Sequence, residues 1–235
     1  MDENEKILSA MSSSIFEPLP DVGMDYLEIG LDSLLEAGPL QEIPIVKTLV
    51  SVCKIGMGWH ERNMLRQLFA FIQELNSGAI SPEQLKEHKE KIEQNSHHFK
   101  EELGRITTIL NGQIDLLQSK VLGAMYRSYI SQEFGWDKFC ELAEANRRMF
   151  VSDYRLLAQF YQFGLSGTNV TNMHQIDRLI SIGLLHNENR IDTIKKDTSN
   201  YEESYDLSVS NDCGLTVFGR EFCQASSSVL LTLSE

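Results

Sequence analysis

Apolar residues recur three and four positions apart along the middle of this chain, and this spacing restricts the fold more than any other feature of the sequence. An α-helix turns once about every 3.6 residues, so side chains at such positions share one face. The clearest run consists of Ile106, Ile109, Leu110, Ile114, Leu117, Val121, Leu122, Met125, Tyr126 and Tyr129. The chain is therefore predicted to be mainly α-helical, with amphipathic helices assembled into a bundle.

Neighbouring segments extend this bundle. Gly135 ends the long run, and Asp137 is expected to cap a further helix that is rich in aromatic residues. Before the long run, Ser81 followed by Pro82 and by Gln84 has the spacing of a capping box, which predicts that a helix begins there. The stretch after Gln84 is strongly charged, so we expect that helix to lie mostly in water.

Negative charge is concentrated at the N-terminus. The 235 residues carry a formal net charge of −13, and residues 1–42 hold ten carboxylates against one lysine. The first 27 residues also contain three consecutive serines and two prolines. Because such a segment offers little apolar surface to bury, we expect most of residues 1–27 to form a poorly ordered acidic arm.

The C-terminal part of the chain differs in character from the bundle. A short apolar helix with Gly183 near its end is followed by the polar stretch 197–212, which suits a β-hairpin or a mobile wing. A short strand then leads through Gly219 into a final helix. This order has the layout of a winged-helix module. We therefore expect a helical bundle over residues 28–165 and a winged-helix-like α+β module over residues 166–235.

The segment from Ile43 to Trp59 is a candidate for contact with a membrane or a partner. Pro44 suits the first turn of a helix, and Gly56 and Gly58 predict a bend or a close helix contact. A membrane span needs about 20 apolar residues, whereas this segment has 17 residues and includes two lysines. A helix buried in the bundle is the favoured interpretation. Interfacial or conditional membrane association is the alternative, because lysines can snorkel and a tryptophan can anchor at an interface. The candidate contacts are Ile45, Val46, Lys47, Leu49, Val50, Lys54 and Trp59.

The charge of the chain argues against nucleic acid as its main target. A phosphate backbone selects Lys and Arg, whereas residues 168–235 hold five basic against ten acidic side chains. A winged helix that binds DNA would use its recognition helix and its wing. The candidate contacts are Gln175 and Arg178 on the helix, with Lys195 and Lys196 on the wing.

The sequence contains none of the common catalytic motifs. It has no phosphate loop, no nucleophile elbow, no zinc-protease helix and no dinucleotide-binding fingerprint. The four cysteines form no CxxC pair, and the adjacent His97 and His98 would point about 100° apart on a helix, so we interpret them as a surface dipeptide. We expect reduced thiols, no metal, no cofactor and no catalytic residues, and hence a protein that is not an enzyme.

Four stretches of the chain carry a resemblance to a known group of proteins. They are "EIPIVKTLVSVCKIG…LRQLFAFIQEL", the charged helix 83–94, "VLGAMYRSYISQEFGWDKFCELAEA" and "RLISIGLL…LTVFGREFCQA". In order and spacing, from about residue 30 to about residue 225, they resemble the abortive-infection alpha-type (Abi-alpha) family of bacteria. The resemblance implies an all-α body with a winged-helix-like end and a role in phage defence, in which an infected cell stops growing before the phage matures. It supplies no catalytic residues.

From these features we expect a non-enzymatic bacterial anti-phage protein that acts through protein contacts or conditional membrane association, with the segment from Ile43 to Trp59 as its effector. Two alternatives stay open: a winged-helix transcriptional regulator of a prophage or defence operon, and a scaffold or antitoxin-like partner protein. We expect a protein partner or a homo-oligomer, and neither nucleic acid nor a small-molecule substrate. Because no secretory signal is evident, we expect a cytoplasmic protein that can lie at the periphery of the inner membrane.

Overall fold

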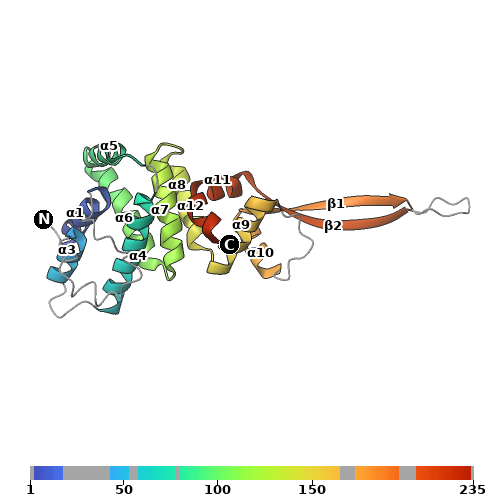
Figure 1. The fold of residues 1–235 in the computed structure, drawn as a ribbon, viewed down its shortest axis with the longest axis horizontal. Helices are drawn as coiled ribbons and strands as arrows, with labels where there is room; N and C mark the ends of the chain where they lie inside the picture. The colour runs from blue at the N-terminus through green and yellow to red at the C-terminus, as the bar shows by residue number, and fades with distance from the viewer. Residues whose placement is uncertain are drawn as a thin grey trace, which may run out of the picture. The chain divides into compact units, whose positions relative to one another are not determined.

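The computed structural model describes residues 3–17, 43–52, 58–77, 80–164, 173–195 and 205–233. These residues are mainly α-helical, as the apolar spacing predicted, and the strands among them form a two-stranded sheet (Figure 1). The chain divides into two compact units, Met1–Arg147 (unit 1) and Arg148–Glu235 (unit 2).

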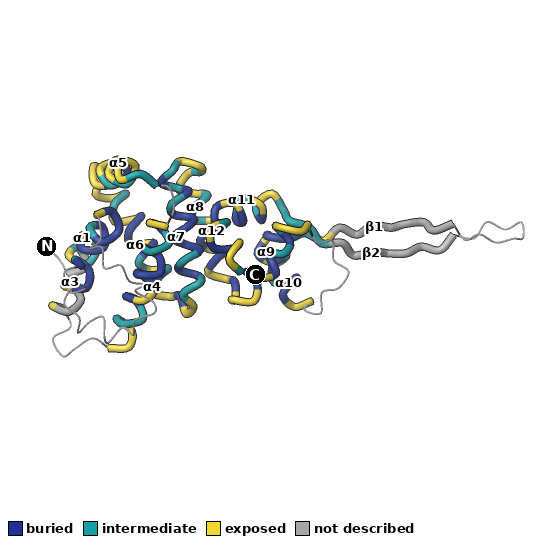
Figure 2. Tube along the Cα trace, in the orientation of Figure 1, coloured by how far each residue is buried: buried dark blue, intermediate teal, exposed yellow. Residues whose placement is uncertain are grey.

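Unit 1 is a helical bundle built around the pair α4 and α7. Its helices are α1 (Glu3–Phe16), α3 (Pro44–Val52), α4 (Trp59–Asn76), α5 (Pro82–Glu93), α6 (Ser96–Gly112), α7 (Leu116–Ile130) and α8 (Trp136–Arg147). Continuous buried stretches lie at 67–72 on α4 and at 121–126 on α7 (Figure 2). The two helices approach closely at Gly123, where a Cβ atom would lie 2.5 Å from the carbonyl oxygen of Phe71. Glycine is therefore required at this crossing.

The N-terminal segment corrects one expectation from the sequence. Residues 3–16 of the supposed acidic arm form helix α1, and residues 18–27 lie outside the described residues. Helix α1 buries Met11, Ile15 and Phe16, which recur at helical spacing. The Glu5 side chain of this helix is 41% exposed. The prediction of disorder was wrong for this helix because the apolar stripe buries enough surface to hold it.

Two further corrections concern helix length. The run from Ile106 to Tyr129 was predicted as one helix, but the chain leaves the helical conformation between Gly112 and Leu116. There the Asp115 N–H donates to Gln118 Oε1 (3.5 Å), which satisfies one of the free donors at the start of α7. The helix after Gly135 is likewise interrupted, because the Phe150 N–H donates to Asp153 Oδ2 (2.8 Å) and a new helix begins.

The helix starts predicted at Ser81 and Pro44 are confirmed, whereas Asp137 lies in the first turn of α8 and does not cap it. Ser81 and Gln84 form a capping box at the start of α5, with the Gln84 N–H donating to Ser81 Oγ (3.2 Å) and the Ser81 N–H donating to Gln84 Oε1 (3.0 Å). Helix α3 begins at Pro44. The expected bend at Gly56 falls outside the described residues, whereas Gly58 directly precedes α4.

Unit 2 begins earlier than predicted. It holds α9 (Val151–Phe163), α10 (Met173–Ser181), β1 (Leu185–Lys195), β2 (Tyr205–Leu215), α11 (Val217–Ala225), α12 (Ser227–Leu230) and a 3-10 turn (Leu231–Leu233). The sequence placed α9 in the bundle, with a boundary after residue 165. Instead, α9 packs against α10, α11 and β2, so the boundary lies between Arg147 and Arg148.

The predicted hairpin is present, but its first strand starts before the expected stretch 197–212. Strands β1 and β2 pair antiparallel, with Leu185 opposite Leu215 and Lys195 opposite Tyr205. Gly219 was expected to connect strand and helix, yet it lies inside α11, and its N–H donates to the capping residue Thr216 (Oγ1, 2.8 Å). A Cβ at Gly219 would lie 2.1 Å from the Leu184 carbonyl oxygen, so α11 packs directly on the start of the hairpin.

Candidate functional site

The apolar side chains that the structure describes at the start of α3 are buried, and α3 packs against α1. Ile45 and Val46 have no exposed surface, and the Ile45 N–H donates to Ser14 Oγ of α1 (3.1 Å). Lys47 is exposed, and Trp59 at the start of α4 is 80% exposed. The side chains of Leu49 and Val50, and the whole of Lys54, lie outside the described residues. No helix in the described part of the chain combines the length and the apolar character that crossing a membrane requires.

Ion pairs connect α1 to the helices beside it. Glu17 Oε1 accepts from Lys89 Nζ of α5 (2.8 Å), and Glu5 Oε1 accepts from Lys100 Nζ of α6 (2.8 Å). The hydrogen bond from Lys89 lowers the pKa of the Glu17 carboxyl. Both pairs are partly exposed, so each stabilises the contact only modestly.

The candidate nucleic-acid contacts on α10 are engaged inside unit 2. Gln175 is buried. Arg178 donates to both carboxylate oxygens of Asp153, from Nε to Oδ2 (2.8 Å) and from Nη2 to Oδ1 (2.5 Å), and its guanidinium lies 4.5 Å from the centre of the Phe150 ring. Neither side chain is displayed as a recognition helix would require. The side chain of Lys195 and the whole of Lys196 lie outside the described residues.

Unit 1 contains a buried polar cluster that the sequence did not predict. Glu102 of α6 has no exposed surface and accepts hydrogen bonds through both carboxylate oxygens. Oε1 accepts from the Tyr126 hydroxyl (2.6 Å) and from His88 Nε2 (2.7 Å). Oε2 accepts from the Tyr129 hydroxyl (3.1 Å), and His98 Nε2 lies 3.5 Å away. Because a carboxylate only accepts, these contacts fix the hydrogen of His88 on Nε2.

The two phenols of this cluster are held in their neutral form. Burial and the negative charge of Glu102 raise the pKa of Tyr126 well above its ordinary value. The same two causes raise the pKa of Tyr129. Both hydroxyls therefore remain hydrogen-bond donors to Glu102 near neutral pH. This arrangement neutralises a buried charge by hydrogen bonding and leaves no phenolate to act as a base.

Aromatic rings surround the cluster and connect it to two other helices. The His88 ring lies 5.8 Å from that of Phe16 in α1 and 5.2 Å from that of Tyr129. Trp136 of α8 stacks on Phe139, with the ring centres 5.2 Å apart and the planes at 21°. The rings of Tyr129 and Trp136 lie 5.5 Å apart.

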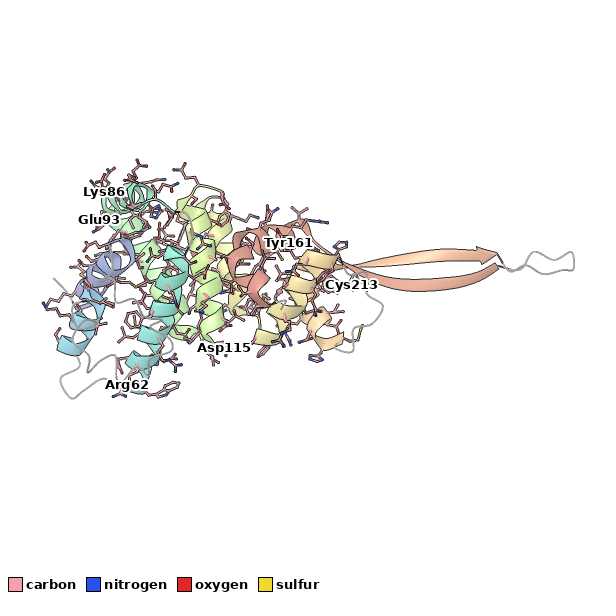
Figure 3. The ribbon with its side chains drawn as sticks, viewed as in Figure 1. Arg62, Lys86, Glu93, Asp115, Tyr161 and Cys213 are labelled. Atoms are coloured by element: carbon pink, nitrogen blue, oxygen red, sulfur yellow. The ribbon has the colours of Figure 1, made fainter. Side chains whose placement is uncertain are left out.

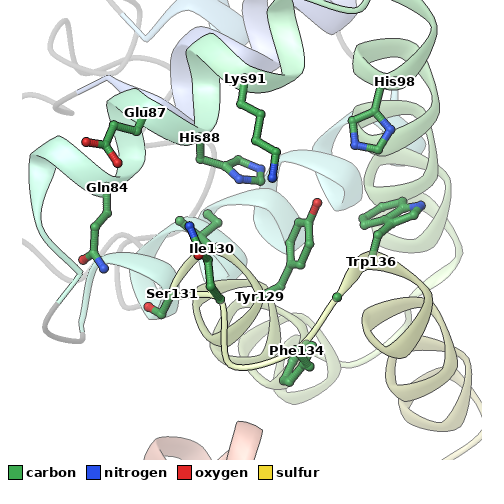
Figure 4. A pocket seen from close by; sticks show the side chains of 12 residues that line it. Gln84, Glu87, His88, Lys91, His98, Tyr129, Ile130, Ser131, Phe134 and Trp136 are labelled. Carbon is green, nitrogen blue, oxygen red and sulfur yellow. The ribbon is translucent and has the colours of Figure 1, made fainter.

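A cavity of about 780 Å³ opens beside the cluster, with α5, α6, α7 and the α7–α8 turn as its walls. His88 and Lys91 reach into it from α5, His98 faces it from α6, and Tyr129 and Trp136 lie opposite (Figure 4). The turn contributes Gln132, whose φ of 61° is in the left-handed region. Among the described non-glycine residues, Gln132 alone has a positive φ.

The sequence contained one signal for this site. His98 and Glu102 are four residues apart on a helix, so they share a face, yet His98 was interpreted as part of a surface dipeptide. The structure corrects that interpretation for His98, whose side chain is 33% exposed, and agrees with it for His97, which is 88% exposed. His88 could not be recognised, because its partners lie on α6 and α7.

Neither Cys140 nor Cys223 is an activated nucleophile. Burial raises the pKa of the Cys140 thiol despite the nearby Arg105, and burial raises the pKa of Cys223 to about 12. A thiol with a raised pKa stays protonated and reacts slowly.

Neither a metal site nor a similar known protein identifies the function of this cluster. Within the described residues, no three His, Cys, Asp or Glu side chains are arranged to hold a metal ion. No protein-family model, no curated protein and no solved structure matches this chain.

Proposed function

We propose that this chain is a non-enzymatic bacterial anti-phage protein of the abortive-infection type, which acts when the segment around α3 becomes available to a partner protein or to the inner-membrane surface. The observation that carries the proposal is the covering of α3 by α1, in which Ile45 and Val46 are fully buried and the Ile45 N–H donates to Ser14. In this proposal the structure corresponds to the inactive state, in which α1 covers α3.

The way α1 is held supports a reversible release. Its apolar face contacts α3, α5 and α6, and its ion pairs to Lys89 and Lys100 are partly exposed. Surface ion pairs contribute about 0.2–1 kcal/mol each, and α1 contacts α3, α5 and α6 less extensively than α4 contacts α7. We therefore expect α1 to separate at a smaller cost than α4 and α7. Separation would expose an apolar patch suited to an interface and too short for a span. The protein would act in the cytoplasm and at the inner-membrane surface.

Charge reversal tests this release. In Lys89→Glu/Lys100→Glu, repulsion replaces both attractions, so we expect faster hydrogen exchange at the α1 amides. We also expect growth arrest without phage, together with recovery in the membrane fraction or with a partner. Adding Glu17→Lys and Glu5→Lys restores opposite charges across both contacts and should return the wild-type behaviour.

Lys86→Glu is the matched control for this experiment. Lys86 lies on α5, is 77% exposed and faces Glu90, so its reversal leaves α1 in place (Figure 3). Faster exchange at α1 without any change in growth, phage protection or fractionation would overturn the proposed function. Unchanged phage protection by Lys47→Glu would count against the exposed lysine of α3 as a contact.

The order α10, β1, β2 and α11 in unit 2 supports a second candidate, a winged-helix regulator of a prophage or defence operon. This candidate is less favoured, because Gln175 is buried and Arg178 is paired with Asp153. Its test is salt-dependent binding of the protein to the DNA upstream of its own gene. Absence of binding at low salt would exclude it.

A further inference from the structure

The cavity beside Glu102 has no part in the proposed function, yet it has the size of a ligand site. Its volume of about 780 Å³ is within the range of about 300–1,000 Å³ that is typical of small-molecule pockets. Its lining combines aromatic rings with polar side chains from three helices and a turn. The chemistry of this lining defines the class of ligand.

Several side chains that line the cavity can donate hydrogen bonds to a ligand. Lys91 has no ion-pair partner among the described residues, and Gln84 uses Oε1 to accept from Ser81, which leaves its amide NH₂ as a donor. Ser131 and Gln132 add a hydroxyl and a second amide. Glu87 is the one carboxylate among the lining residues, and the oxygens of Glu102 below are already hydrogen-bonded. Lys91, together with the neutral donors of Gln84, Ser131 and Gln132, can bind an anionic group.

The opposite wall is aromatic, and its rings are held in place, with the planes of Tyr129 and Trp136 at 51° to each other. Trp136 stacks on Phe139 and lies against Tyr129, while Tyr129 is tied to Glu102 by its hydroxyl. Rings fixed in this manner provide a surface for stacking at little cost in conformational entropy.

Gln132 provides an independent observation at the same place. The Gln132 N–H donates to the Tyr129 carbonyl, and the Glu133 N–H donates to the Ser128 carbonyl (3.0 Å each). These two bonds form a Schellman motif at the end of α7, in which the position of Gln132 is usually occupied by glycine. A glutamine with φ of 61° is strained, and strain of this kind is concentrated at ligand sites.

We propose that this cavity binds a flat aromatic anion, with its ring against Trp136 and its anionic group toward Lys91, Gln84 and Gln132. The ligand is bound and not chemically changed. The proposal goes beyond the function proposed above and does not depend on it.

Trp136 provides a direct measurement of binding. The chain has two tryptophans, and Trp59 is 80% exposed at the start of α4, so Trp59→Phe leaves Trp136 as the only indole. We would titrate this variant with adenosine 5′-monophosphate and with 4-hydroxybenzoate. Each compound has an aromatic ring and an anionic group, and the two represent nucleotides and aromatic carboxylates. Adenosine and phenol are the neutral counterparts. We expect one anion to change the fluorescence saturably, and its neutral counterpart to bind at least about tenfold more weakly.

Two variants assign this binding to the cavity. Lys91→Glu should weaken binding by about tenfold or more, whereas Lys86→Glu on the same helix should leave it unchanged. Gln132→Gly should raise the melting temperature, because glycine adopts this φ without strain, and at the same time weaken binding severalfold. The proposal is overturned if neither anion gives a saturable change up to about 10 mM, or if Lys91→Glu and Lys86→Glu bind alike. None of these measurements requires phage, so they are independent of the test of α1 release.

Discussion

Glu102 shows how a single carboxylate can organise a helical core. It has no exposed surface and receives hydrogen bonds from Tyr126, His88 and Tyr129, which lie on two other helices. Burying a charge is costly unless the charge is fully hydrogen-bonded. Glu102 therefore stabilises the packing of α5, α6 and α7 only when all three donors are in place.

Glu102→Gln is expected to destabilise unit 1. The substitution keeps the shape of the side chain but replaces an acceptor oxygen with an NH₂ group that faces other donors. We expect the free energy of unfolding to fall by about 2–4 kcal/mol, measured by urea denaturation. The control is Glu101→Gln, since Glu101 is 48% exposed and lies 3.8 Å from His97. A loss for Glu102→Gln no larger than for this control would contradict the role given to the cluster.

The raised pKa values of Tyr126 and Tyr129 predict how stability depends on alkaline pH. A phenol whose pKa is raised in the folded state remains protonated up to a higher pH there than in the unfolded chain. Its stabilising contribution is therefore complete below the unfolded pKa of about 10 and is lost as pH rises above it. Each such phenol adds up to about 1.4 kcal/mol of lost stability per pH unit.

Tyrosinate absorbance and urea denaturation between pH 9 and 12 measure this effect. We expect the two phenols to ionise only together with unfolding. Tyr129→Phe removes one of them, so the decline of stability with pH should become shallower. A decline as steep as that of the wild type would show that Tyr129 does not contribute.

At the scale of elements, helix ends decide where the bundle divides. Asp153 is fully buried in the first turn of α9, accepts from the Phe150 N–H and binds Arg178 of α10 through both oxygens. It therefore starts α9 and joins α9 to α10. The sequence predicted helix over this region but no interruption, because Phe150 is not a usual capping residue and Arg178 lies 25 positions away.

Asp153→Ala should destabilise unit 2 markedly. It removes the acceptor for the Phe150 N–H and leaves the partly buried Arg178 without its carboxylate. We expect a loss of about 3 kcal/mol, seen in urea denaturation and as faster hydrogen exchange in α9 and α10. Glu144→Gln, which alters the exposed pair between Arg147 and Glu144, should change stability by about 0.5 kcal/mol or less. Equal losses of stability in the two variants would show that the burial of Asp153 is not the cause of its effect.

At the scale of the whole molecule, each unit has its own core. Unit 1 buries Leu68 and Phe71 of α4 together with Leu122 of α7, and unit 2 buries Leu157 of α9 with Phe222 of α11. Because the boundary falls between Arg147 and Arg148, α9 belongs with the C-terminal elements.

Truncation tests this boundary. Residues 1–147 should fold by themselves, with Trp136 fluorescence and a urea midpoint like those of unit 1 in the full chain. Residues 1–165 end at the boundary that the sequence suggested and carry α9 without its partners, which leaves Tyr154, Leu157 and Phe160 uncovered. We expect this longer fragment to aggregate more readily, measured by light scattering. The opposite ranking of the two fragments would contradict the boundary.

The sequence by itself determined the helical class, the capping box at Ser81, the start at Pro44 and the presence of a hairpin. Each of these depends on residues close together in the chain, where propensity and hydrogen bonding act locally. Only the tertiary structure decided that α1 is ordered, that α9 belongs to unit 2 and that His88, Glu102, Tyr126 and Tyr129 meet. Those outcomes depend on burial against distant helices, and the energy of a buried polar contact exists only after the fold has removed water from it.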